Sequence, residues 1–152
     1  MATGFKGQRV FVDTNILYYA NNPSDPFGTQ ALARMKDLLS DGNNLIISGQ
    51  ILREYAHASI RDARKSGKGI AEATADALHN IQIFKRDFLV LHDDEAVLDV
   101  WIELLPMLLT QKDVFDCNLV AIMQVNDIRH ILTHNVSDFS RFPGIVVIPM
   151  FS

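Results

Sequence analysis

Residues 9–15 read Arg-Val-Phe-Val-Asp-Thr-Asn, a short apolar run that stops abruptly at three polar residues. Runs of this length that are rich in Val and Phe are typical of buried β-strands. Four comparable runs follow at residues 45–47, 88–91, 130–133 and 145–148. Buried strands that alternate with amphipathic helices predict parallel strands joined by crossover helices. The expected fold is therefore α/β, a three-layer α/β/α sandwich around a mainly parallel sheet of about five strands.

Apolar residues at helical spacing predict five helices, at residues 29–39, 50–60, 70–86, 95–105 and 114–125. In the last two helices, Leu98 and Phe115 are expected on the same apolar faces as their apolar neighbours. The polar, glycine-containing stretch from Arg61 to Gly69 is expected to be a loop between two helices. The chain shows no repeat, linker or low-complexity tract, so residues 1–152 are expected to form a single domain.

Composition limits the class of protein. Apolar residues make up 48% of the 152 residues and charged residues 21%, as in ordinary globular domains. The single cysteine, Cys117, excludes an intramolecular disulfide and a multi-cysteine zinc site. The N-terminus lacks the apolar segment of a secretory signal, and no apolar run is long enough for a membrane span, so a cytoplasmic location is expected. The net charge of −4 means that nucleic acid would have to bind through a cation or a local basic patch.

Four acidic residues stand where a ligand site is expected, because ligands of open parallel sheets bind beyond the carboxyl ends of the strands. They are Asp13, Glu54, Asp116 and Asp138. Each has an ordinary alternative: Asp13 and Asp138 are typical helix caps, Asp116 is a first-turn acid, and a single Glu is usually solvated. Asp113 is expected to be the N-cap of the helix that carries Asp116, which leaves Asp116 free to face the site.

Taken together, these four acids favour a metal site. Carboxylates that converge in one cleft repel one another unless a cation is present. Hard cations such as Mg²⁺ or Mn²⁺ prefer carboxylate and water oxygens. Such a site suits the hydrolysis of a phosphodiester bond.

Four segments carry a resemblance to a known family. Residues 12–15 (Val-Asp-Thr-Asn), residues 46–54, residues 115–121 and residues 132–139 resemble, in order, the motifs of the PIN-domain family, and especially the VapC-type toxins of toxin–antitoxin pairs. The resemblance extends from Val10 to Pro149. It implies an endoribonuclease that uses Mg²⁺ or Mn²⁺, is often a homodimer and is often silenced by a small antitoxin protein.

The resemblance also implies residue roles. It assigns the metal site and the catalytic groups to the same four acids, Asp13, Glu54, Asp116 and Asp138. It gives a supporting role to three neighbours, Asn15, Thr133 and Asn135. His134 stands where many relatives carry Arg, which implies that a contact to substrate phosphate is altered or missing.

A basic group is a candidate for contact with the RNA backbone, although it is equally typical of a solvated helix end and loop. Its members are Arg61, Arg64, Lys65 and Lys68, together with Lys112 and Arg141.

Several other functions are less consistent with the sequence. A phosphatase with an aspartyl nucleophile needs a second acid two residues after Asp13, where Asn15 stands, and a receiver domain needs Lys where His134 stands. Two alternatives stay open: a non-catalytic PIN-like interaction module, and a metal-dependent nuclease that acts on DNA.

Overall fold

A five-stranded parallel sheet forms the centre of the molecule in the computed structural model, which describes residues 2–22 and 24–151. The spatial order is β3-β2-β1-β4-β5, and all four neighbouring pairs are parallel. The strands are β1 (Arg9–Val12), β2 (Asn44–Ser48), β3 (Leu89–Leu91), β4 (His130–Thr133) and β5 (Val146–Pro149). The predicted parallel sheet is confirmed, and each strand lies within one or two residues of its expected position.

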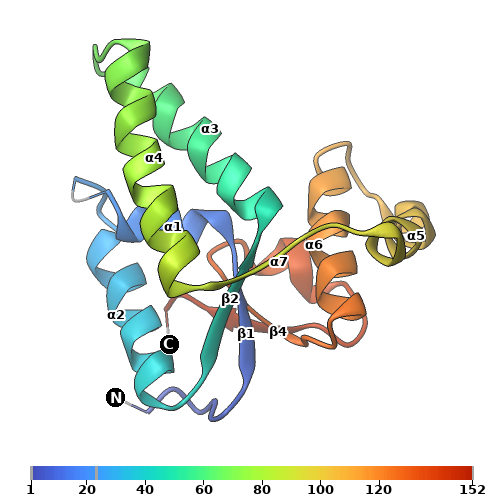
Figure 1. Cartoon of the computed structure of the whole chain (residues 1–152). Helices are drawn as coiled ribbons and strands as arrows, with labels where there is room; N and C mark the ends of the chain where they lie inside the picture. Colours follow the sequence, from blue (N-terminus) through green and yellow to red (C-terminus); the bar gives the residue numbers. More distant parts are fainter. Residues whose placement is uncertain (1, 23, 152) are drawn as a thin grey trace.

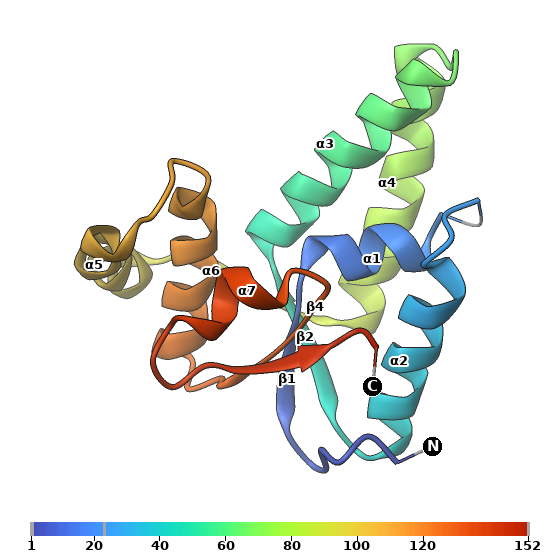
Figure 2. The same ribbon diagram turned by 180° about the vertical axis from the view of Figure 1, so that it is seen from behind.

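Helices connect every pair of consecutive strands. They are α1 (Thr14–Ala20), α2 (Gly28–Ser40), α3 (Gly49–Lys65), α4 (Ile70–Asp87), α5 (Glu95–Leu104), the 3₁₀ turn η1 (Leu105–Met107), α6 (Asp113–Val125) and α7 (Val136–Ser140). The views in Figures 1 and 2 show α1 to α4 on one side of the sheet and α5 to α7 on the other. The predicted α/β/α class is therefore confirmed.

The direction in which successive strands are added to the sheet reverses between β1 and β4. From β1 the sheet grows through β2 to β3, and the chain then returns to place β4 on the other side of β1. Because parallel crossovers are right-handed, this reversal moves the later helices to the opposite face. Strands β1 and β4 remain hydrogen-bonded up to their carboxyl ends, where the Asp13 N–H donates to the Leu132 carbonyl at 3.0 Å. A crevice is expected at this reversal point, beyond the carboxyl ends of β1 and β4.

β1 lies at the middle of the core. Val10, Phe11 and Val12 are fully buried, because helices cover both faces of the central strand. A strand that is buried on both sides needs a continuous apolar run and not an alternating one. Residues 10–12 form such a continuous apolar run, which ends at the polar residues that follow β1.

The prediction of a loop from Arg61 to Gly69 is wrong for residues 61–65. Helix α3 continues through Lys65, so residues 66–69 alone connect it to α4, with Gly67 at a φ of 100°. Arg, Ala and Lys are good helix formers, and the end of α3 needs no apolar stripe because it projects beyond the sheet. Figure 1 shows α3 and α4 as a hairpin that extends away from the strands.

Two further differences concern the helices near the crevice. The sequence analysis predicted no helix at Thr14–Ala20, because seven residues are too few for a clear apolar period. Leu98 and Phe115 do not share the burial of their apolar neighbours: they are 52% and 63% exposed. Among the described residues, no helix has the length and apolar character required to cross a membrane.

Candidate functional site

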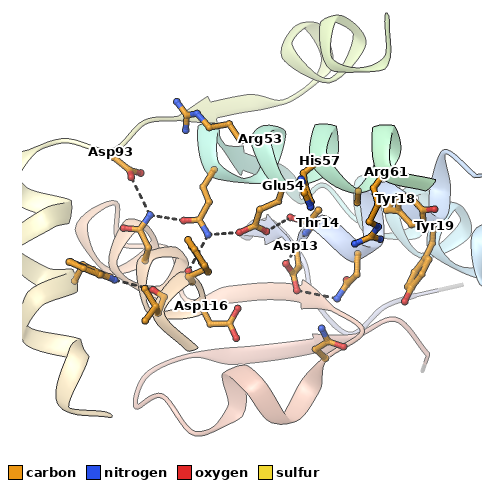
Figure 3. A pocket seen from close by; sticks show the side chains of 18 of the residues that line it. Asp13, Thr14, Tyr18, Tyr19, Arg53, Glu54, His57, Arg61, Asp93 and Asp116 are labelled. Carbon is orange, nitrogen blue, oxygen red and sulfur yellow. Dashed lines mark hydrogen bonds between the residues drawn. The ribbon is translucent and has the colours of Figure 1, made fainter. Parts of the chain in front are cut away.

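A cleft of about 930 Å³ opens at the carboxyl ends of the strands, lined mainly by α1, α3, α5 and α6. Three of the four predicted acids line it: Asp13, Glu54 and Asp116. Figure 3 shows these three side chains grouped around one part of the cleft, although they come from different segments of the chain. The fourth acid, Asp138, lies in the first turn of α7 and interacts electrostatically with Asp13 and Asp116.

Asp13 joins the end of β1 to the start of α1. It is the N-cap of α1, and its Oδ1 accepts the Thr14 N–H at 2.7 Å. Its Oδ2 accepts the Thr133 hydroxyl at 2.7 Å and the Asn15 amide at 3.2 Å. Burial nevertheless raises the pKa of Asp13 to about 6, and the charges of Glu54 and Asp138 add to this effect. The same carboxylate thus caps α1 and belongs to a residue that lines the cleft.

Glu54 lies in the second turn of α3, and its carboxylate is held on both oxygens. Oε2 accepts the Thr14 hydroxyl at 2.7 Å, and Oε1 accepts the Gln50 amide at 2.6 Å. Helical side chains lean toward the N-terminus of their helix, and here that lean directs Glu54 back toward the strand ends. The alternative of a freely solvated Glu is therefore inconsistent with its contacts.

Asp116 lies in the first turn of α6, half-buried. Burial, followed by the charges of Asp13, Asp138 and Glu54, raises the pKa of Asp116 to about 7. The four carboxylates therefore act electrostatically on one another. Within residues 2–22 and 24–151, no Lys or Arg forms an ion pair with any of the four. The negative charge of the four acids is therefore not balanced by any ion pair among the described residues.

The residues present fit a hard divalent cation. All of the candidate ligands are carboxylates, and burial together with the neighbouring carboxylates raises the pKa of Asp13 and Asp116, an environment that a bound cation would relieve. In the described part of the chain, no three acidic, histidine or cysteine side chains are already grouped as ligands of one ion. Mg²⁺ does not require such a cage, because it usually keeps several waters and binds one or two carboxylates together with substrate phosphate.

The three predicted supporting residues surround Asp13. The Thr133 hydroxyl donates to Asp13 and accepts the Asn135 N–H at 3.0 Å. Asn15 contacts both Asp13 and Thr133, and its Oδ1 accepts the His134 N–H at 3.3 Å. Asn135 contributes its backbone to this network, and its side chain lines the cleft. Together these contacts fix the Asp13 carboxylate between β1 and β4.

His134 is packed among aromatic rings. Its imidazole lies 4.9 Å from the Phe27 ring, 5.7 Å from Tyr19 and 5.8 Å from Phe151, measured between centroids. These rings come from α1, from the residue before α2 and from the end of the chain, so His134 helps to hold three segments together beside the site.

A polar network that the sequence analysis missed links α6 to α3. The Asn118 amide donates to Gln50 Oε1 at 2.6 Å and to Asp93 at 3.1 Å. Gln50 in turn donates to Glu54 and to the Phe115 carbonyl, the latter at 3.1 Å. Gln50 stands four residues before Glu54 and is almost fully buried, and this i, i+4 spacing is the one signal that the sequence offered.

The predicted basic residues do not all lie together. Arg61 lines the cleft, whereas Arg64, Lys65 and Lys68 lie at the projecting end of α3 and in the turn after it. Lys68 is paired there with Asp76 at 2.6 Å. Two cationic or hydrogen-bonding side chains of the cleft were missed, Arg53 and His57, although both stand on α3 near Glu54.

The region before α6 differs from expectation. Lys112, an exposed residue, is the N-cap of α6, and the prediction that Asp113 caps this helix is wrong. The Asp113 carboxylate instead accepts the N–H groups of Leu109 and Thr110, which hold its pKa below the usual value. It also pairs with Arg141 at 3.1 Å, so Arg141 is engaged in closing this loop.

Comparisons with known proteins agree with this architecture. The sequence profile of the PIN domain matches residues 10–145. No curated protein sequence is significantly similar to the chain.

Solved structures are similar in fold at low sequence identity. VapBC2 from Rickettsia felis, bound to a DNA fragment from its promoter, is 18% identical, with a TM-score of 0.64 over 92% of this chain and 97% of that one. VapC20 from Mycobacterium tuberculosis, described as a sarcin–ricin loop cleaving toxin, is 16% identical, with a TM-score of 0.65 over 86% and 95%. VapBC-1 from nontypeable Haemophilus influenzae is 14% identical, with a TM-score of 0.67 over 95% and 100%.

We expect Asp116→Asn to stabilise the metal-free protein. The folded-state pKa of about 7 lies above the ordinary value of 3.8, so the Asp116 carboxyl lowers the stability of the fold progressively as the pH rises from about 4 to about 7, and the loss levels off above pH 7. Solvent screens part of this effect because the side chain is half-buried. In EDTA at pH 8, the melting temperature should exceed that of the unmodified protein by about 2–4 °C, which corresponds to about 1 kcal/mol, and the gain should shrink toward pH 5.

Thermal melts followed by circular dichroism provide the measurement. Asp99→Asn, at an exposed position of α5 outside the cleft lining, is the matched control and should change the melting temperature little. A lower melting temperature for Asp116→Asn at pH 8 would show that the four acids do not repel one another as described.

Proposed function

This chain belongs to the PIN domain family, and from that premise we propose that it is a metal-dependent endoribonuclease, the toxin of a toxin–antitoxin pair. PIN domains are nucleases, and the finer assignment rests on one observation above all. Carboxylates from the end of β1, from α3, from α6 and from α7 lie close enough to disfavour ionisation of Asp13 and Asp116, and in the described part of the chain none of the four forms an ion pair with Lys or Arg. Such a site is poorly suited to a purely structural role, because unpaired charges that are taken from water are costly.

We assign each acid a role. Asp13 and Asp116 would hold the ion, since burial and neighbouring acids raise the pKa of both and a cation would offset these effects. Glu54 and Asp138 would complete the ligand shell or orient the attacking water. Bound Mg²⁺ or Mn²⁺ would supply a Lewis acid and lower the pKa of that water. Thr133 and Asn15 would keep Asp13 in place through their hydrogen bonds.

RNA is the proposed substrate. One relative of the same fold is described as a toxin that cleaves the sarcin–ricin loop, and this supports RNA over DNA for the present chain. The metal chemistry is the same for both polymers, so the assay compares them directly. A small antitoxin is the proposed partner, since several similar structures are toxin–antitoxin complexes. We also propose a homodimer, as in many members of the family, and a cytoplasmic location.

The backbone of the RNA would follow α3. Glu54, His57, Ala58 and Arg61 repeat at helical spacing and line the cleft, so one face of the helix presents the site acid first and then two hydrogen-bond donors. Arg53 adds a second guanidinium at the same wall. These side chains would contact the phosphates that flank the scissile bond, which resolves how a chain with a net charge of −4 attracts RNA.

We expect Asp13→Asn and Asp116→Asn each to reduce Mn²⁺-dependent cleavage of single-stranded RNA by roughly 100-fold or more, the scale of losing one charge-stabilising group in other enzymes. The assay follows a fluorescently labelled RNA with Mn²⁺ and with EDTA, and a DNA of the same sequence runs alongside. Asp99→Asn should cleave normally. Full activity in a folded Asp116→Asn protein would refute the site, and cleavage of the DNA alone would refute the substrate.

Gln50 should act as a positioning residue for Glu54. We expect Gln50→Ala to lower kcat about 10- to 100-fold with little change in KM, as for residues that orient metal ligands in other enzymes. Gln50→Glu should be at least as damaging, because a carboxylate of the same size cannot donate to Glu54 and adds repulsion. Gln82→Ala, on an exposed part of α4, is the control. Equal kinetics for all four proteins would remove Gln50 from the mechanism.

The salt dependence of RNA binding should separate the two sets of basic residues. For single strands, each lost phosphate contact lowers the slope of log K against log salt by about 0.7, so Arg53→Gln combined with Arg61→Gln should lower it by about 1.4. A second variant, in which Arg64, Lys65 and Lys68 are neutralised together, measures how much these three residues contribute to the slope. Lys85→Gln on α4 should leave the slope unchanged. An unchanged slope in the first variant would contradict the proposed path along α3.

A further inference from the structure

The cleft has an apolar half that the acids do not explain. Leu98, Trp101, Val114 and Phe115 line the same cleft as Asp116, on the wall formed by α5 and α6. Phe115 directly precedes Asp116 and is 63% exposed, and Leu98 is 52% exposed. Exposed apolar side chains that gather in one place and are rimmed by polar residues often mark a binding groove, and this wall has that character.

The backbone around Phe115 is fixed from two sides. The Trp101 indole N–H donates to the Val114 carbonyl at 3.0 Å, which ties α5 to the start of α6. The Gln50 amide donates to the Phe115 carbonyl at 3.1 Å, which ties α3 to the same turn. The backbone of Phe115 is therefore anchored where the residue lines the cleft.

We propose that this wall is a nucleobase-binding subsite, in which one unpaired base beside the scissile phosphate stacks on Phe115 and is bordered by Leu98 and Trp101. The inference rests on the proposed nuclease function and extends it to the recognition of the substrate. A base is flat, apolar on its faces and joined to its phosphate by one sugar. It therefore suits an aromatic surface that adjoins a site for a phosphate.

The arrangement of charge favours this occupant. The acids share the cleft with Leu98, Trp101 and Phe115, and Figure 3 shows His57 and Arg61 following Glu54 along α3. A strand that crosses the cleft would meet donors for its phosphates on one side and an apolar surface for a base on the other. Grooves that combine cationic and aromatic walls are typical of single-strand binding, and a paired base could not offer its face to Phe115.

Intrinsic fluorescence gives a direct test, because Trp101 is the only tryptophan of the chain and borders the proposed subsite. The probes are adenosine 5′-monophosphate and ribose 5-phosphate in Mg²⁺, which differ in the base and contain no phosphodiester bond to be cut. We expect saturable quenching by the nucleotide and none by the sugar phosphate at equal concentration. Equal responses to both would overturn the proposal.

Variants of Phe115 sharpen the test. Phe115→Ala should weaken nucleotide binding about 5- to 100-fold, the range found for base–aromatic stacking, whereas Phe115→Tyr should retain it. Ile102→Ala is the matched control, because Ile102 is 53% exposed on α5 but does not line the cleft. Unchanged nucleotide affinity in Phe115→Ala overturns the subsite. If that variant instead changes the oligomeric mass alone, the wall is a contact between copies and the proposal fails.

Cleavage of RNA in Mn²⁺ is measured on the same proteins. If the nucleotide does not change the fluorescence of a protein that still cleaves RNA, the subsite is refuted and the nuclease function stands. Quenching by the nucleotide in a protein without any cleavage would refute the nuclease function and leave a site for nucleotides.

Discussion

Asp13 carries the constraint on which both the sheet and the site depend. Its carboxylate must accept hydrogen bonds from the start of α1 and from Thr133 at the end of β4, and so it locks the two central strands at their carboxyl ends. The same group is buried beside other acids, which opposes its ionisation. The fold therefore holds a charge where charge is unfavourable, and the surrounding apolar strands, Val10 to Val12 above all, supply the stability that makes this possible.

Hydrogen bonds to Thr14 and Gln50 oppose the repulsion that the other acids exert on Glu54. Carboxylates from separate segments would move apart unless each were fixed. Glu54 is held by Thr14 and Gln50, and Gln50 also binds the turn that precedes Asp116. The polar network thus sets the separation of α3 and α6, and with it the width of the cleft. Hydrogen bonds thus order the Asp13 and Glu54 carboxylates independently of any ion, which reduces the side-chain entropy that either would lose on binding a ligand.

The sequence predicted the sheet, its strands and the location of the acids, because buried strands and the ends at which acids collect leave local patterns. It did not predict Gln50 or Asn118, whose roles depend on contacts 68 residues apart in the chain. Polar composition alone misassigned residues 61–65 to a loop, since a projecting helix needs no apolar stripe. The prediction that Phe115 shares the face of its apolar neighbours failed because hydrophobicity alone does not reveal whether a side chain faces the core or a cleft.

The hairpin of α3 and α4 has a mechanical consequence. Tyr55 and Phe84 pack edge to face at 4.9 Å and Asn80 donates to the Tyr55 hydroxyl, so the two helices brace each other. Lys65 lies about 16 Å beyond Glu54 along the same helix axis. Because α4 braces α3 along its length, the helix that carries Glu54 is stiffened well beyond the sheet.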